Sequence, residues 1–316
     1  MKRTSIPVVD LDQFRSNDPK IKNEFVKEIG NAYSDIGFVA IENHGIDKEL
    51  IKKLYEEIKK FFNLDSEIKQ RYENVHGGQR GFTSFGKEHA KDSNKGDLKE
   101  FWHFGQILEE NDPLRAEYPD NVFVDELADF NKYGLQAYTI FEETGKLILQ
   151  SLALYLGIDE FYFDSWVDKG NSILRPIYYP PITEAPEGAV RAGAHEDINL
   201  ITLLVGASAE GLEVQDRDGV WLAAKAKEDQ IVVNVGDMLQ RLSNNKLKST
   251  THRVINPPKE KWATPRYSVP FFLHPQSAMP LNCLSECIDE EHPKAFEDIT
   301  SGQYLIERLR EIGLIK

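Results

Sequence analysis

Hydrophobic side chains recur at helical spacing in the first half of the chain. Apolar positions three or four residues apart predict helices at residues 19–35 and 47–63, and Asp47 is expected to cap the second helix. The same pattern over residues 121–156 predicts a long bracing helix with at most one break. In contrast, GFVAIENHGI, residues 37–46, predicts a strand that ends in a turn.

The pattern changes after about residue 171, where short β-rich runs are separated by Gly, Pro, Asp and Asn. The runs are SILRPIYYPPI, NLITLLVG, GLEVQD, GVWLAA, QIVVNVG, KSTTHRVI and RYSVPFFL. Strands of this length and spacing predict a sandwich or barrel. Gly236 and Asp237 are expected to begin a tight turn, and residues 300–311 predict a last helix. The expected fold is therefore mainly β with helical support.

Residues 77–96 show neither a helical nor a strand period. Gly and polar residues dominate GGQRGFTSFGKEHAKDSNKG, which predicts a long loop of the kind that often carries function. We therefore expect this loop to form part of a substrate wall or lid. The residues expected near it are Arg80, Phe82, Phe85 and Trp102.

Charge and composition exclude several kinds of partner. The 316 residues carry a net charge of -14, and such a chain repels phosphate backbones, so no nucleic-acid partner is expected. The sequence shows no signal peptide and no apolar run of about 18 residues, so no membrane partner is expected. With only Cys283 and Cys287, a disulfide framework is excluded, and we expect a reducing, cytoplasmic location.

Candidate metal ligands stand at the start of an apolar run, in RAGAHEDINLITLL. His195 and Asp197 are two residues apart, so their side chains point to one face of an extended segment. His252, in a second strand-like run, can lie opposite them in a folded sheet. Two imidazoles and one carboxylate suit Fe(II) with three open coordination positions, although Zn²⁺ uses similar ligands. The ligand types alone therefore leave the metal open.

A candidate carboxylate-binding pair follows in RYSVPFFL. Arg266 and Ser268 are also two residues apart in a predicted strand. A guanidinium among apolar side chains is costly without an anionic partner, and arginine binds carboxylates in bidentate fashion. A small dicarboxylate that bridges the metal and Arg266 would meet both requirements.

These motifs, in this order, resemble the isopenicillin N synthase-like family of iron(II) and 2-oxoglutarate-dependent oxygenases. IPVVDLDQF and GFVAIENHGI are similar to the N-terminal region of the family, and YYPP precedes the first ligand. HEDINLITLL matches the first metal motif, and RYSVPFFL matches the R-x-S cosubstrate motif. GLEVQDRDGVWLAA and VVNVGDMLQRLSNNKLKSTTHRV match the core between the ligands, so the resemblance covers nearly the whole chain.

The resemblance implies a double-stranded β-helix, or jelly-roll, fold. On this basis residues 1–120 form an N-terminal α/β region and residues 121–170 the bracing helices. Residues 171–280 form the jelly-roll oxygenase core, and residues 281–316 form a C-terminal helical segment.

The resemblance also implies roles for individual residues. His195, Asp197 and His252 would be the catalytic iron ligands, Arg266 and Ser268 would hold the far carboxylate of 2-oxoglutarate, and Tyr179 would add a hydrogen bond. The implied reaction uses O2 to hydroxylate a small-molecule substrate and releases succinate and CO2, with ascorbate as an optional reductant. We expect a monomer. The chain departs from many family members at Ile177, where they carry Asn.

Two alternative functions stay open at this point. One is an iron-dependent oxidase of the same fold that does not use 2-oxoglutarate, because R-x-S binds other carboxylates within the family. The other is a non-catalytic jelly-roll binding module. Arg175 and Arg191 flank the site, where they either bind an acidic substrate or pair with the many carboxylates of the surface.

Overall fold

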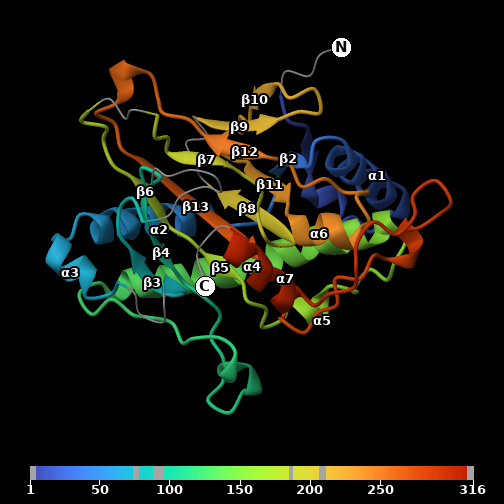
Figure 1. The fold of residues 1–316 in the computed structure, drawn as a ribbon, viewed down its shortest axis with the longest axis horizontal. Helices are drawn as coiled ribbons and strands as arrows, with labels where there is room; N and C mark the ends of the chain where they lie inside the picture. The colour runs from blue at the N-terminus through green and yellow to red at the C-terminus, as the bar shows by residue number, and fades with distance from the viewer. Residues whose placement is uncertain (1–4, 74–77, 88–95, 185–187, 206–210, 312–316) are drawn as a thin grey trace.

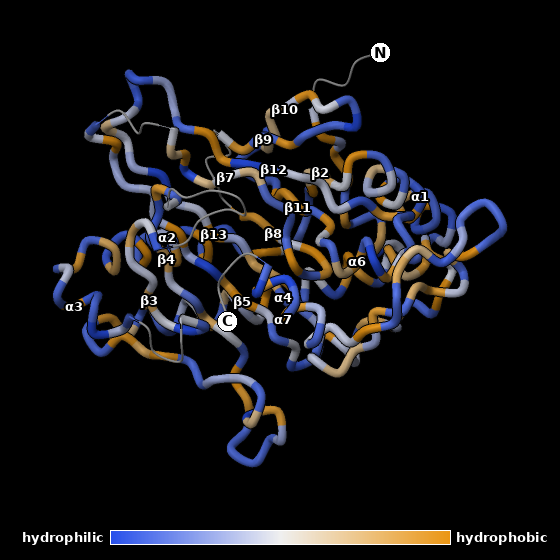
Figure 2. Tube along the Cα trace, in the orientation of Figure 1, coloured by the Kyte–Doolittle hydropathy of each residue, from blue (hydrophilic) through white to orange (hydrophobic). Residues whose placement is uncertain are grey.

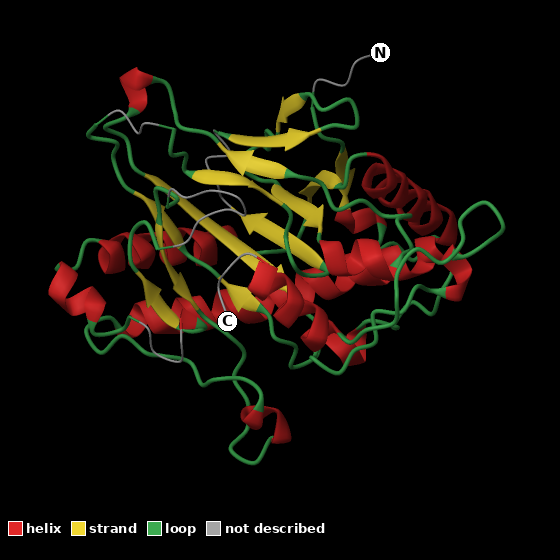
Figure 3. Ribbon diagram, in the orientation of Figure 1, coloured by secondary structure: helices red, strands yellow, loops and turns green. Residues whose placement is uncertain are grey.

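The computed structural model describes residues 5–73, 78–87, 96–184, 188–205 and 211–311. Short strands form two facing sheets, and helices cover the outer side of the larger sheet (Figures 1 and 3). The prediction of a jelly-roll core with helical support is confirmed.

The larger sheet runs through the whole molecule. Its strand order is β1-β2-β11-β8-β13-β6-β4-β3, and β5 pairs with β13. These strands are β1 (Val8–Asp10), β2 (Phe38–Glu42), β3 (Gly81–Thr83), β4 (Glu100–His103), β5 (Ile173–Leu174), β6 (Ile177–Tyr179), β8 (Ile201–Val205), β11 (Ile231–Val235) and β13 (Arg266–Leu273). Strands from residues 1–120 therefore extend both ends of the sheet that residues 171–280 build.

The smaller sheet packs on one face of the larger one. Its strands, in spatial order, are β10 (Trp221–Ala223), β9 (Leu212–Gln215), β12 (His252–Val254) and β7 (Ala192–His195). Buried apolar side chains from both sheets, including Phe38, Val214 and Val232, form one cluster between them. Figure 2 shows hydrophobic segments along the central strands and hydrophilic segments in the peripheral loops.

Helices cover the other face of the larger sheet. The helices of the described residues are α1 (Pro19–Asp35), α2 (Lys48–Phe62), α3 (Ser66–Gln70), α4 (Ala128–Leu156), α5 (Asp164–Val167), α6 (Asp237–Leu242) and α7 (Ser301–Glu311). Short 3-10 turns lie at Leu11–Gln13, Pro113–Ala116, Lys259–Lys261 and Ser285–Cys287. The side chain of Asp47 accepts a hydrogen bond from the backbone of Glu49, as the predicted cap requires. Among the described residues, no helix is both long enough and apolar enough to cross a membrane.

The long helix α4 is the main support of the sheet. It contacts α1, α2 and β13, and it buries Phe130, Phe141, Ile148 and Leu152 completely. Burial of an apolar side chain of this size contributes roughly 1.5–3 kcal/mol. The sheet is therefore held against the helices chiefly by apolar contact along α4.

The start of α4 differs from the prediction. The helix begins at Ala128 rather than at residue 121, and it runs without a break. The side chain of Asn131 binds both the N–H and the C=O of Val124, each over 2.9 Å. These bonds hold the preceding residues in a non-helical conformation despite their apolar content.

Two other local predictions also need correction. The predicted loop at residues 77–96 contains strand β3, in which Phe82 pairs with Trp102 of β4. The chain at Gly236 does not make a tight turn but enters helix α6. The helix forms because apolar residues at helical spacing, including Met238 and Leu242, are buried in the core.

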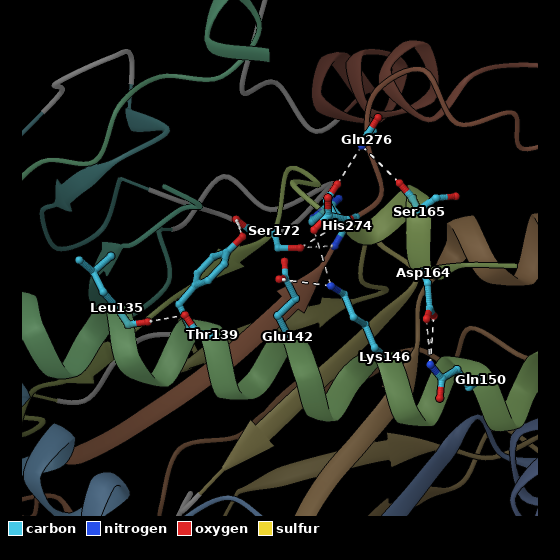
Figure 4. Close-up of polar contacts among 12 residues, drawn as sticks. Leu135, Thr139, Glu142, Lys146, Gln150, Asp164, Ser165, Ser172, His274 and Gln276 are labelled. Carbon is cyan, nitrogen blue, oxygen red and sulfur yellow. Dashed lines mark hydrogen bonds and ion pairs between the residues drawn. The ribbon is translucent and has the colours of Figure 1, made fainter. Parts of the chain in front are cut away.

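One carboxylate on α4 occupies an unfavourable position. The side chain of Glu142 is 16% exposed, and its Oε1 has no hydrogen-bond partner in the described part of the chain. The Nζ of Lys146 lies 3.8 Å from the other oxygen, Oε2 (Figure 4). Burial raises the pKa of Glu142 to about 7, although Lys146 acts in the opposite direction.

We expect Glu142→Gln to change how stability depends on pH. Between pH 4.5 and about 7 the unfolded chain releases a proton that folded Glu142 keeps, so the wild-type protein loses stability as pH rises through this window. Glu142→Gln removes the titrating group, so the variant does not lose stability in this way. The difference in free energy of unfolding, variant minus wild type, should therefore increase by up to about 3 kcal/mol between pH 4.5 and pH 8. Urea unfolding at both pH values measures the difference, and an equal difference at both would contradict the assignment.

Candidate metal centre and active site

One face of the larger sheet carries the polar residues of the site. Side chains alternate along a strand, so Arg266, Ser268 and Phe272 of β13 point to the same side. Thr202 of β8 lies opposite Phe272 on that side, and its hydroxyl donates to Oδ2 of Asp197 over 2.6 Å. The face that carries the predicted carboxylate-binding pair therefore also meets the predicted metal ligands.

The three predicted metal ligands converge. His195 and His252 lie directly opposite each other where β7 pairs with β12, and Asp197 follows the end of β7. One ligand atom from each of the three residues lies within 4.8 Å of the other two. Each imidazole Nε2 is 3.7 Å from Oδ1 of Asp197. Two nitrogens and one oxygen from three protein side chains suit Fe(II) and leave coordination positions open.

Backbone carbonyls orient both imidazoles. Nδ1 of His195 lies 2.7 Å from the carbonyl oxygen of Gly193, and Nδ1 of His252 lies 3.1 Å from that of Thr250. A carbonyl oxygen only accepts hydrogen bonds, so each Nδ1 carries the hydrogen. Nε2 is therefore the nitrogen of each ring that faces the shared metal position.

Hydrogen bonds also fix the carboxylate of Asp197. Its Oδ2 accepts from Thr202 over 2.6 Å and from the side-chain amide of Asn234 over 2.8 Å. Burial opposes ionisation of Asp197, but His252, His195 and these two hydrogen bonds outweigh it and lower the pKa. Asp197 is therefore ionised, with Oδ1 turned toward the imidazoles.

The environment keeps His195 neutral. Burial and then repulsion from His252 lower the pKa of His195 to about 4, and the positive charge of Lys99 acts in the same direction. Metal binding requires the neutral imidazole, which is the form present at pH 7. Although surrounding protein atoms desolvate the ring, 39% of the His195 side-chain surface stays exposed, so this candidate ligand can be reached from outside the protein.

The predicted cosubstrate residues lie together and are buried. Arg266 of β13 lies opposite Tyr179 of β6, and its guanidinium carbon is 4.8 Å from the centre of the Tyr179 ring. Arg191 approaches the same ring to 5.8 Å and donates to the carbonyl oxygen of Thr264. Burial and then the charge of Arg266 lower the pKa of Arg191. Two guanidiniums and the Ser268 hydroxyl thus suit a carboxylate.

The prediction that Phe82 and Trp102 line the substrate site is wrong. Both side chains are almost fully buried in the helix-side core, where their rings lie 5.8 Å and 4.9 Å from the ring of Phe61 in α2. They pair across β3 and β4, so they share the face that points away from the metal ligands. The physical reason is that side chains alternate along β4, so Phe101 and His103, the neighbours of Trp102, point toward the site instead.

The other two residues expected near the loop are placed differently. Arg80 is buried and donates to Oε1 of Gln106 over 2.9 Å, whereas Phe85 is 49% exposed. In the part of the chain that the structure describes, neither residue forms a hydrogen bond or ion pair with a candidate metal ligand. A role for Arg80 or Phe85 in substrate binding therefore stays a prediction.

The structure surrounds Arg175 with three residues that the sequence interpretation missed. The guanidinium of Arg175 lies over the rings of Phe101 and Phe272, at 4.5 Å and 5.0 Å. Nε of Arg175 donates to Nε2 of His103 over 2.6 Å. The alternating run EFWHF, residues 100–104, could have predicted this position for two of them. Phe101 and His103 must point to the side of the strand opposite Trp102.

The jelly-roll fold and the two-histidine, one-carboxylate site define a mononuclear iron oxygenase. A family model described as the non-haem dioxygenase N-terminal region, named for morphine synthesis, matches residues 6–126. The model of the 2OG-Fe(II) oxygenase superfamily matches residues 170–275. A 2-oxoglutarate-Fe(II) type oxidoreductase of Emericella nidulans is 30% identical over 96% of this chain and 90% of its own length. The chain belongs to the 2OG-Fe(II) oxygenase superfamily.

Solved structures agree with this membership. A 2OG-Fe(II) oxygenase family protein from Caulobacter crescentus is 41% identical, with a TM-score of 0.90 over 98% of this chain and 100% of that chain. A full-length Neurospora crassa protein, solved in complex with alpha-KG and thymine, is 31% identical, with a TM-score of 0.85 over 96% of each chain. The predicted family and fold, and the predicted activity of an iron(II) and 2-oxoglutarate-dependent dioxygenase, are confirmed.

We expect Thr202→Val to weaken Fe(II) binding by roughly 10-fold, because residues that support a metal ligand typically contribute this much. The substitution removes one of the two hydrogen bonds to Oδ2 of Asp197 and keeps the side-chain shape. Anaerobic calorimetric titration with Fe(II) measures the affinity. Thr139→Val is the matched control, since Thr139 is exposed on α4 and its hydroxyl bonds only to the Leu135 carbonyl (Figure 4). Equal affinities for Thr202→Val and wild type would contradict this support.

Proposed function

We propose that His195, Asp197 and His252 bind one Fe(II) ion and that the enzyme hydroxylates a small molecule. The observation that carries the proposal is the convergence of these three side chains within 4.8 Å of one another. The neutral imidazole of His195, the ionised carboxylate of Asp197 and the exposed part of the His195 side chain are what a ferrous site with open positions needs.

The proposal assigns the far carboxylate of 2-oxoglutarate to Arg266, Ser268 and Tyr179. Arg266 and Ser268 share the metal-facing side of β13, and Tyr179 lies across from Arg266. Iron held by these residues would supply the oxidising chemistry, in which O2 and 2-oxoglutarate are consumed, succinate and CO2 are released and one oxygen atom goes to a substrate carbon, with ascorbate as an optional reductant. The protein binds and orients the cosubstrate, keeps His195 unprotonated and holds Asp197 ionised.

Arg175 is the proposed contact for the substrate. Phe272 lies opposite Thr202, which binds Asp197, so the ring that supports Arg175 is a near neighbour of the metal site. Two flanking rings and the bond to His103 restrict the guanidinium before any ligand arrives. Such a group suits a small molecule with carbonyl or carboxylate oxygens.

A flat, carbonyl-bearing substrate is therefore the first class to test. Thymine, the molecule in the Neurospora crassa complex, is a flat ring with two carbonyl oxygens. The similarity of this chain to the Neurospora crassa protein supports flat, carbonyl-bearing rings as the substrate class and guides the choice of the first compounds to test. We further propose that the enzyme is a monomer. We also propose a reducing, cytoplasmic compartment, which the free thiols of Cys283 and Cys287 support.

Two other functions would give different experimental results. An oxidase of this fold that does not use 2-oxoglutarate would turn over substrate with no succinate release. A non-catalytic binding module would show no O2 uptake after addition of iron. Arg266 and Ser268 are buried on the face of the larger sheet that meets the proposed metal ligands, which favours the use of a dicarboxylate cosubstrate.

We expect Arg266→Met to raise the KM for 2-oxoglutarate by roughly 10- to 100-fold, because charge-assisted hydrogen bonds contribute about 1.5–3 kcal/mol. Arg266→Lys should fall between the variant and wild type, since it keeps the charge and loses the bidentate geometry. Succinate release at varied 2-oxoglutarate concentration measures the effect. A KM that is unchanged in Arg266→Met would remove this residue from the cosubstrate site.

We expect Arg175→Met to lose substrate-stimulated succinate release while the slow release without substrate continues. The reason is that the substitution removes the guanidinium from the substrate side and leaves the metal and cosubstrate residues intact. The control is Arg241→Met, which removes an arginine that lies over Phe296 and Tyr304 away from this face. If stimulation by the wild-type substrate survives in Arg175→Met, the substrate lies elsewhere.

A further inference from the structure

The segment of residues 97–99, just before β4, is fastened to the start of β7. The backbone N–H of Leu98 donates to the carbonyl of Val190 over 3.1 Å. Oδ1 of Asp97 accepts from the backbone N–H of Gly193 over 3.1 Å. The Asp97 side chain is only 8% exposed, so this bond lies inside the protein.

Gly193 lies at an irregular point of the smaller sheet. His252 pairs with His195 and Val254 pairs with Ala192, so two residues of β7 oppose one residue of β12. A bulge of this kind leaves part of the strand without its ladder partner. The glycine also lacks a side chain that packing could hold, and its backbone is intrinsically free. The bond from Asp97 therefore restrains a position that the sheet itself holds weakly.

The same glycine orients the first candidate metal ligand. Its carbonyl oxygen lies 2.7 Å from Nδ1 of His195, and this bond sets which nitrogen faces the metal position. A displaced Gly193 would release the imidazole to rotate or to exchange its hydrogen between the two nitrogens. Asp97 thus acts on the ring through one intervening residue.

We propose that Asp97 is a positioning residue for His195, acting through the bulged Gly193. The inference rests on the proposed role of His195 as an iron ligand. Lys99 completes the arrangement, because its Nζ lies 2.9 Å from Oδ2 of Asp97 and both side chains are 8% exposed. A buried carboxylate without such a partner would be costly. Residues 97–99 thereby connect the loop before β4 to the metal ligand.

The test is Co(II) binding by the metal-free protein, followed by visible absorption. Asp97→Ala should weaken Co(II) binding by roughly 10-fold or more, the usual effect of losing a group that orients a metal-ligating histidine. Asp97→Asn should recover most of the affinity, because its amide oxygen can still accept from Gly193. An unchanged affinity in Asp97→Ala would overturn the proposal.

A neighbouring ion pair supplies the matched control. Glu100 and Lys69 are joined over 2.7 Å and are 11% and 10% exposed, close to the burial of the Asp97–Lys99 pair. Glu100 lies on the opposite side of β4 from Phe101 and so points away from the metal ligands. Glu100→Ala should reduce stability and leave Co(II) binding unchanged. Equal losses of Co(II) affinity in Glu100→Ala and Asp97→Ala would show a merely structural effect and overturn the proposal.

A second readout does not depend on any metal. In the metal-free protein, nitrogen NMR of labelled histidine should show His195 with hydrogen on Nδ1, and Asp97→Ala should convert it to a mixture of forms while His252 is unchanged. An unchanged His195 signal would contradict the inference even if iron binds elsewhere. Should wild type fail to bind Co(II), the proposed function fails, and the NMR result still tests Asp97. If Asp97→Ala does not fold, the double variant D97A/K99M, which buries no lone charge, takes its place in both measurements.

Discussion

The pairing of β7 with β12 is the constraint on which the site depends. It sets His195 directly opposite His252, although the two residues lie far apart along the chain. The two imidazoles then need only local carbonyls, those of Gly193 and Thr250, to turn their free nitrogens toward Asp197. A sheet register and two short hydrogen bonds thus prepare the ligand geometry before any metal binds.

Alternation along the strands gives the larger sheet two faces, and the face away from the helices carries both apolar residues that pack on the smaller sheet and the polar residues of the site. One side packs on α1, α2 and α4 through residues such as Trp102 and Phe271. The other side carries Arg266, Ser268 and Thr202, next to the metal ligands. Polar and charged groups can be buried there because they bind one another or surround a position for an anion. The helices therefore stabilise the sheet from the side opposite the candidate metal ligands.

Much of this arrangement could be predicted from the sequence, because each correctly predicted feature depends on a local pattern or on motifs that occur in a fixed order. The helices at residues 19–35 and 47–63, the short strands and the H-x-D and R-x-S pairs are of this kind. The substrate face was missed because it depends on which side of β4 meets the helices. Trp102 is the largest aromatic there and was assigned to the substrate, whereas packing against Phe61 places it in the core. The hydrogen bond between Asp97 and Gly193 joins segments that are distant in the sequence, at a bulge. A local sequence pattern cannot predict such a contact.

The assignment of His195, Asp197 and His252 as ligands of one ferrous ion can be tested by anomalous diffraction from crystals soaked anaerobically with Fe(II) and 2-oxoglutarate. We expect a single iron peak about 2.0–2.2 Å from both imidazole Nε2 atoms and from Oδ1 of Asp197, the usual range for such ligands. An iron peak bound away from His252, or no peak in iron-soaked crystals, would contradict it.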